Sequence, residues 1–152
     1  MDKIIISDTS CLIAFSKIDK LDLLKDLYHE IVITTDVYQE FNGSLPEWIL
    51  ITEVKDKQKQ IDFEKRLDKG EASSIALALE TENATLIIDE IKGRKIAKSY
   101  NINIIGTIGI ILLADRKGLT SDVTGIILRL VNNGFRLSNK LLNKIIEEYG
   151  RK

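Results

Sequence analysis

Short runs of isoleucine, leucine and valine alternate with longer segments of helical pattern along this chain of 152 residues. Four runs have the character of strands and a fifth is a candidate: Ile4–Ser7, Ile31–Thr34, 85–88, Asn103–Ile105 and, as the candidate, 49–54. Strands that are apolar on both sides and separated by helices are typical of a parallel sheet with both faces covered. The sequence therefore predicts an α/β fold, a three-layer α/β/α sandwich with a mostly parallel central sheet.

Helical patterns fill the segments between these strands and the whole C-terminal part of the chain. The predicted helices cover residues 10–17, 20–28, 36–42, 57–67, 70–80, 91–100, 107–117, 122–132 and 138–149. Gly118 and Gly134 follow two of them and are expected to end them, because glycine readily adopts the left-handed conformation found at helix C-termini.

The composition is that of an ordinary globular protein, with 44% hydrophobic and 30% charged residues. No low-complexity tract or long charge block interrupts the chain, so we expect one domain over residues 1–152. Cys11 is the only cysteine, which excludes an internal disulfide and fits a reducing compartment. No apolar run approaches the length of a signal peptide or membrane span, so we expect a soluble, cytoplasmic protein. The net charge of −1 argues against non-specific coating of nucleic acid but does not exclude a nuclease.

Acidic side chains follow three of the predicted strands. Asp8 follows the first strand, Asp36 and Glu40 follow the second, and the pair Asp89-Glu90 follows the run at residues 85–88. Ligands of open α/β sheets bind outside the carboxyl ends of the strands. These carboxylates are therefore candidates for a common site at one edge of the sheet.

Each of these positions also has a purely structural interpretation. An N-cap side chain accepts hydrogen bonds from the free amides at a helix start. Asp68 and Glu71 fit a D-x-x-E variant of the capping box at the start of the helix EASSIALALE. Four residues at the strand ends are also of good N-cap type: Asp8, Asp36, Asp89 and Thr107. Capping alone explains any one of them taken singly.

Glu40 does not fit the capping interpretation. It lies about one turn inside its helix, three residues after Val37 and next to Phe41, on a face that we expect to be buried. A buried carboxylate is costly unless it is paired or bound to a cation, and no lysine or arginine lies within a helical turn. Carboxylates gathered at one edge repel each other, and a divalent cation such as Mg²⁺ relieves that repulsion.

The acids occur in an order that resembles the acidic set of PIN-domain nucleases. Asp8 lies in IIISDTSCLIAF, Glu40 in TTDVYQEF, Glu71 in DKGEASSIALALE and Asp89 in LIIDEIKGRKIA. The resemblance is close to the VapC-like PIN proteins, with their GEA-x-x-x-A-LA, D-[DE]-x-x-GR-x-A and GT-x-G motifs. The matching positions are Gly70-Glu71-Ala72 with Ala76–Ala78, Asp89-Glu90 with Gly93-Arg94 and Ala97, and Gly106-Thr107-Ile108-Gly109. The C-terminal segment GFRLSNKLLNKIIEEYG also resembles that subfamily, so the likeness covers essentially the whole chain.

One departure concerns the end of the 85–88 strand. Many PIN proteins carry two aspartates there, whereas this chain has Asp89-Glu90. We expect Asp89 to face the metal, because Glu90 would more naturally point outward.

The resemblance implies metal-dependent hydrolysis of phosphodiester bonds in RNA, with Mg²⁺ or Mn²⁺ as the cofactor. In such a site Asp8 and Asp89 would bind the metal directly, and Glu40 and Glu71 would bind through water or orient the nucleophile. All four acids are thus candidate catalytic and metal-binding residues. Ser10 would in addition help to start the helix that follows Asp8.

Hydroxyl and basic side chains near the acids are candidate substrate-binding residues. Thr9, Ser10 and Thr107 would support the acids or contact phosphate. Lys92 and Arg94 lie on the helix that begins at the proposed site, and a guanidinium can bind phosphate through two hydrogen bonds. The alternative for these two cations is a solvated helix face.

Two other functions compete with a ribonuclease. Phosphatases of the haloacid-dehalogenase type also begin with a strand followed by aspartate, but they use D-x-D, and Ser10 stands at the second position. A PIN-like module that binds or regulates without catalysis is the second alternative. The VapC likeness further implies a toxin of a toxin–antitoxin pair, a small antitoxin partner and a homodimer.

Overall fold

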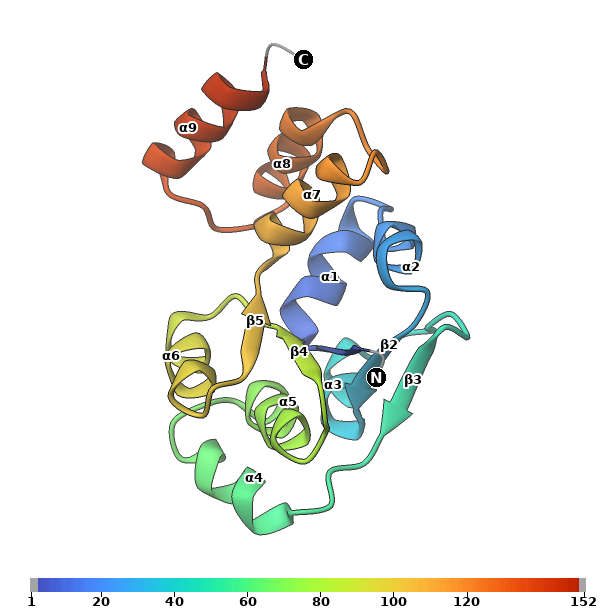
Figure 1. The fold of residues 1–152 in the computed structure, drawn as a ribbon, viewed down its shortest axis with the longest axis vertical. Helices are drawn as coiled ribbons and strands as arrows, with labels where there is room; N and C mark the ends of the chain where they lie inside the picture. The colour runs from blue at the N-terminus through green and yellow to red at the C-terminus, as the bar shows by residue number, and fades with distance from the viewer. Residues whose placement is uncertain (1–2, 151–152) are drawn as a thin grey trace.

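The computed structural model describes residues 3–150, which form one sheet and the helices around it (Figure 1). Its strands are β1 (Ile4–Ser7), β2 (Ile31–Thr34), β3 (Ile49–Thr52), β4 (Ala84–Ile87) and β5 (Asn103–Ile105). They lie in the order β3-β2-β1-β4-β5, and every neighbouring pair is parallel. The predicted parallel sheet is confirmed, and the candidate strand at 49–54 forms one edge.

Helices connect the strands and complete the chain beyond the sheet. The described helices are α1 (Thr9–Lys17), α2 (Asp22–Tyr28), α3 (Thr35–Phe41), α4 (Lys57–Glu64), α5 (Lys69–Leu79), α6 (Ile91–Ser99), α7 (Thr107–Arg116), α8 (Val123–Asn132) and α9 (Asn139–Tyr149). Gly118 and Gly134 have φ angles of 74° and 99°, so both helix ends predicted at glycine are confirmed. None of the described helices is both long and apolar enough to cross a membrane.

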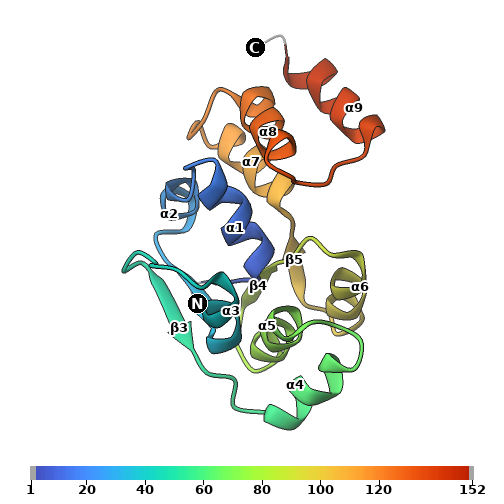
Figure 2. The same ribbon diagram turned by 180° about the vertical axis from the view of Figure 1, so that it is seen from behind.

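Two hydrophobic cores lie on opposite faces of the sheet, as the three-layer prediction requires. Adjacent strand residues face opposite sides, so Ile5 packs into one core and Ile6 into the other. The first core contains buried residues of α1, α2, α7 and α8, and the second contains those of α4, α5 and α6. Figures 1 and 2 show these helix groups at opposite ends of the molecule, with the sheet between them.

The carboxyl ends of the strands meet at one edge of the sheet because all strands are parallel. From this edge the chain continues into α1 after β1, α3 after β2, α6 after β4 and α7 after β5. Helix α5 packs against the same region, with contacts to β1, β2, β4 and α3. Its small residues Ala72, Ser73, Ser74 and Ala76 are buried and permit this close approach. The acids of the sequence motifs are thereby placed around a single edge.

Candidate active site

Asp8 lies at the end of β1 with only 1% of its surface exposed. Its Oδ1 accepts a hydrogen bond from the backbone amide of Cys11 at 3.3 Å and so caps α1. This corrects the expectation that Ser10 helps to start that helix, because Ser10 is an exposed residue of the first turn. The second oxygen of Asp8, Oδ2, is buried and has no hydrogen-bond partner among the described residues. The carboxylate thus caps a helix with one oxygen and leaves the other free.

Glu71 presents a second free carboxylate oxygen from the first turn of α5. Its backbone amide donates to Asp68 Oδ1 at 2.9 Å, as the predicted D-x-x-E start of this helix requires. The side chain is 9% exposed, and Oε2 has no hydrogen-bond partner among the described residues. A Cβ at Gly93 would lie 3.4 Å from this oxygen and 2.5 Å from Ile88 Cδ1. The glycine therefore lets α6 approach Glu71 closely.

Asp89 is held by the start of α7. Its Oδ1 accepts from the Thr107 amide at 2.8 Å, and its Oδ2 accepts from the Thr107 hydroxyl at 2.6 Å. The N-cap of α6 is Glu90, whose side chain accepts from Gly93, so the expectation that Asp89 caps its own following helix is wrong. The N-cap of α7 is Gly106 rather than Thr107, and that of α3 is Thr34 rather than Asp36.

Glu40 is exposed, which corrects the prediction of a buried position. Helix α3 has only seven residues, and Glu40 lies near its end, beyond the part that Val37 anchors in the core. Its carboxylate nevertheless turns toward the other acids, because Oε1 accepts from the Thr9 hydroxyl at 3.0 Å. A Cβ at Gly70 would overlap this oxygen and would lie 2.8 Å from Thr9 Oγ1. Glycine at position 70 therefore makes room for the Glu40 carboxylate.

Burial and mutual repulsion raise the pKa values of these acids. The pKa of Asp8 rises to about 8, first because the carboxylate is desolvated and then because of the negative charge of Asp89. The pKa of Glu71 also rises to about 8, through desolvation first and then through its hydrogen bond and charge interaction with Asp68. Desolvation raises the pKa of Glu40 as well. The negative charges therefore destabilise one another unless protons or a cation neutralise them.

Asp68 belongs to this acidic cluster, although its sequence position suggested only a helix cap. Its charge raises the pKa values of Asp8, Glu40 and Glu71. The cap interpretation is also satisfied, because Oδ1 accepts from the Glu71 amide. The capping motif did not indicate that Asp68 would lie close to the other acids, because that proximity depends on how α5 lies against α1 and α3.

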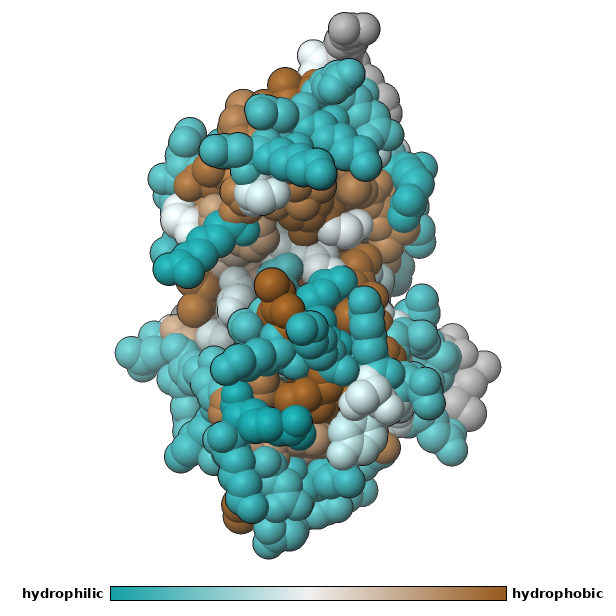
Figure 3. Space-filling model, turned by 90° about the vertical axis from the view of Figure 1, so that its left-hand side faces the viewer, coloured by the Kyte–Doolittle hydropathy of each residue, from teal (hydrophilic) through white to brown (hydrophobic). Residues whose placement is uncertain are grey.

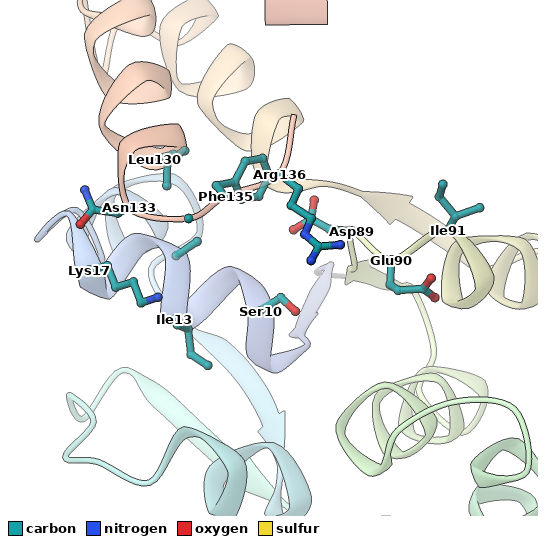
Figure 4. Close-up of a pocket in the computed structure, with 12 residues that line it drawn as sticks. Ser10, Ile13, Lys17, Asp89, Glu90, Ile91, Leu130, Asn133, Phe135 and Arg136 are labelled. Carbon is teal, nitrogen blue, oxygen red and sulfur yellow. The ribbon is translucent and has the colours of Figure 1, made fainter. Parts of the chain in front are cut away.

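Basic side chains lie around the acids in three places. Arg94 Nη1 donates to the backbone carbonyl of Ile88 at 2.9 Å, and Lys92 is exposed on the first turn of α6. Arg136, in the connection between α8 and α9, extends its guanidinium beside the carboxylate of Asp89, whereas the Glu90 carboxylate points away (Figure 4). Arg136 was not among the predicted site residues. In the sequence this segment was marked by the helix stop at Gly134 and by the VapC-like character of GFRLSNKLLNKIIEEYG, neither of which assigned a role to Arg136.

The residues present suit a divalent cation. Asp8 Oδ2 and Glu71 Oε2 are buried carboxylate oxygens without hydrogen-bond partners, and hard cations take oxygen ligands. Within residues 3–150, no three His, Cys, Asp or Glu side chains already stand close enough together to form a complete metal-binding group. Mg²⁺ usually keeps several of its water molecules and is bound by one or two carboxylates together with substrate phosphates, so the two free oxygens are sufficient.

A sequence model of the PIN-domain family matches residues 4–151. The chain belongs to the PIN-domain family. No curated protein and no solved structure matches the chain significantly. PIN domains are generally nucleases and typically use divalent metal ions. The five-stranded parallel sheet between two helical layers is consistent with the family fold.

Proposed function

We propose that this PIN domain hydrolyses phosphodiester bonds in RNA with the help of Mg²⁺ or Mn²⁺. The observation that carries the proposal is the pair of unpartnered buried oxygens, Asp8 Oδ2 and Glu71 Oε2, within a cluster that also contains Asp89. Burying such groups is unfavourable unless something else compensates for the lost hydration. A cation bound by these oxygens supplies that compensation.

Three of the four predicted acids are proposed to bind the cation, and the fourth, Glu40, lies at the exposed rim of the site. Asp8 and Asp89 remain the proposed direct ligands, and Asp89 is oriented by its two hydrogen bonds from Thr107. Glu71 has a free oxygen and joins them as a ligand or through water. Glu40 lies at the exposed rim, where it orients a water molecule together with Thr9. When bound, the divalent cation lowers the pKa of a coordinated water and neutralises charge on the attacked phosphate.

The candidate substrate-binding residues have different accessibility. Thr107 is fully buried and its hydroxyl donates to Asp89, so we assign it to positioning that acid rather than to phosphate contact. Ser10 and Lys92 are exposed at the start of their helices and are free to meet a phosphate. Arg94 is tied to the carbonyl of Ile88 through one of its five N–H groups. Its remaining donors are available to an RNA backbone.

The cellular role that fits this proposal is that of a VapC-like toxin. A small antitoxin would then cover the acidic site, and two copies of the chain would form a homodimer. These proposals rest on the family resemblance.

Cleavage assays distinguish this function from its alternatives. Purified protein, freed of any partner, is incubated with single-stranded and structured RNAs in Mg²⁺, Mn²⁺ or EDTA. We expect metal-dependent cleavage that is lost in Asp8→Asn and Glu71→Gln and kept in Asp26→Asn, which alters an exposed carboxylate on α2. Hydrolysis of small phosphate esters without RNA cleavage would favour the phosphatase. RNA binding without any cleavage would favour the inert module.

A further inference from the structure

Two hollows lie side by side at the acidic edge of the sheet, and both are lined by Asp89, Phe135 and Arg136. The first has a volume of about 620 Å³ and extends along α1 to Lys17. The second has a volume of about 470 Å³ and extends along β5 and α7 past Arg94. Each volume falls within the range of roughly 300–1,000 Å³ that is usual for small-molecule sites. Each hollow is therefore large enough for one nucleotide.

The wall between the hollows comes from the connection between α8 and α9. Gly134, with its positive φ, ends α8, and the amides of Gly134 and Phe135 donate to Val131 and Leu130 at 3.1 and 2.9 Å. These hydrogen bonds fix the chain where it crosses the acidic edge. Phe135 is half-buried against the first core, so its position is determined by packing as well. The wall is thus a fixed part of the fold.

Both hollows combine apolar walls with positive charge. Ile13, Ala14 and Leu130 line the first, and Ile108, Leu137 and Leu141 line the second. On the side where α6 and α9 lie, Figure 3 shows hydrophobic surface between hydrophilic ends of the molecule. The ion pairs recorded for residues 3–150 include none of the cations at the hollows, which are Lys17, Arg94 and Arg136.

Apolar walls, together with cations that form no ion pair among the described residues, match the chemistry of an unpaired nucleotide chain. Bases of single strands stack on aromatic and apolar side chains, while their phosphates bind arginine and lysine. A duplex presents its bases to each other and cannot place them in two such hollows. The order Lys17, Arg136, Arg94 follows the groove from one hollow to the other, across Asp89.

We propose that Phe135 and Arg136 position two successive nucleotides of the RNA in this groove, one in each hollow. Phe135 lies between the two bases and stacks on one of them, and Arg136 binds the phosphate that joins them. That phosphate is thereby placed beside Asp89, where the proposed hydrolysis takes place. The inference rests on the proposed nuclease function for its choice of RNA, and it adds the two subsites and the residues that position the substrate in them.

Binding is measured in the Asp8→Asn background, which keeps the capping oxygen and removes the acid needed for cleavage. The probe is a fluorescein-labelled single-stranded RNA of mixed sequence, followed by anisotropy at several salt concentrations. Arg136→Ala and Lys17→Ala are expected to lower the slope of log K against log [salt] by about 0.7 each. Phe135→Ala is expected to weaken binding about 5- to 100-fold, through the lost stacking.

Matched variants separate these effects from misfolding. Phe135→Tyr keeps the aromatic ring and is expected to bind like the parent, whereas Phe135→Leu keeps the apolar packing and is expected to bind weakly. Arg116→Ala removes an exposed arginine from the opposite end of α7 and is expected to change neither affinity nor slope. A duplex of the same sequence is expected to bind at least about ten times more weakly than the single strand.

The result that overturns the inference is unchanged affinity and salt slope in Arg136→Ala, Lys17→Ala and Phe135→Leu. If the protein with Asp8 intact cleaves RNA while these groove variants cleave equally well, the groove proposal fails and the nuclease proposal stands. If the Asp8→Asn protein binds as predicted while the protein with Asp8 intact cleaves no RNA, the nuclease proposal fails and the groove proposal stands.

Discussion

Asp89 and Thr107, 18 residues apart in the sequence, are joined by two hydrogen bonds at the carboxyl edge of the sheet. The backbone amide of Thr107 donates to Oδ1 at 2.8 Å and its hydroxyl to Oδ2 at 2.6 Å. The acid after β4 therefore receives its orientation from the helix after β5. Thr107 itself is fully buried, so the hydroxyl acts on a substrate only through Asp89.

Removing the Thr107 hydroxyl should weaken catalysis more than folding. Thr107→Val keeps the side-chain volume and the backbone hydrogen bond but leaves Asp89 Oδ2 without its donor. We expect a loss of about 1–2 kcal/mol in the free energy of unfolding and roughly 10- to 100-fold slower RNA cleavage. Thr107→Ser, which keeps the hydroxyl, should restore most of the rate. Equal rates for the Val variant and the parent would show that the orientation of Asp89 is unimportant.

Gly70→Ala should disturb the site without unfolding the protein. The added Cβ overlaps the Glu40 carboxylate, which is the flexible end of an exposed side chain and can move away. Helix α5 gains up to about 1 kcal/mol in helix propensity from the replacement of glycine. We therefore expect an unchanged or higher melting temperature together with slower cleavage.

Gly93→Ala, on α6, should lower the melting temperature, in contrast to Gly70→Ala. Its Cβ would lie 2.5 Å from Ile88 Cδ1 inside the second core, where side chains have little freedom to move. Overpacking of this kind costs about 1–3 kcal/mol, so the melting temperature should fall. Thermal melts of the two glycine variants side by side check both predictions. A lower melting temperature for Gly70→Ala than for Gly93→Ala would contradict them.

The metal-free protein should lose stability as the pH rises. The pKa values of Asp8 and Glu71 are raised from 3.8 and 4.5 to about 8 in the folded state. Between these values the folded protein holds protons that the unfolded chain releases, so the free energy of unfolding falls as pH increases from about 4 through 8. Melting temperatures in EDTA should therefore be lower at pH 9 than at pH 5.5. Mn²⁺ should reduce the difference, because the cation replaces the protons.

Asp8→Asn should stabilise the metal-free fold at alkaline pH. The amide keeps the oxygen that caps α1 and removes a carboxylate charge that is buried at high pH. We expect a gain on the order of 2 kcal/mol at pH 8.5, or roughly 5 °C in melting temperature. The same variant should show a flatter pH dependence than the parent in EDTA. A loss of stability at pH 8.5 would mean that the Asp8 charge is compensated within the fold.

The sheet and its acids could be predicted from the sequence because each depends on local pattern. Ile4–Ser7 and Ile31–Thr34 are short apolar runs that end in polar residues, and both form strands within the bounds expected. Asp8 was correctly placed at a strand end. One of its carboxylate oxygens caps α1 and the other has no hydrogen-bond partner among the described residues, so both properties belong to one side chain. Because the strands are parallel, their carboxyl ends lie at the same edge of the sheet, and no further information from the sequence is needed to place the acids there.

The predictions that were wrong, and the site residues that were missed, depend on contacts between segments that are distant in the sequence. In the pair Asp89-Glu90 both residues are able to cap α6, and the choice is made by Thr107, which takes both oxygens of Asp89. Helical periodicity placed Glu40 near the buried face after Val37, but α3 has only seven residues and its side chains after Val37 are not buried. Phe135 and Arg136 lie in an irregular connection, which has no periodicity to interpret.

Binding of Mn²⁺ tests the central claim most directly, because it depends on neither the RNA sequence nor a partner. Electron paramagnetic resonance of a Mn²⁺ titration at pH 7.5 counts free and bound ion in one sample. We expect saturable binding to the unaltered protein, loss of that binding in Asp8→Asn and Glu71→Gln, and no change in Asp26→Asn. Equal binding by all four proteins would contradict the assignment of this acidic edge as a divalent-cation site.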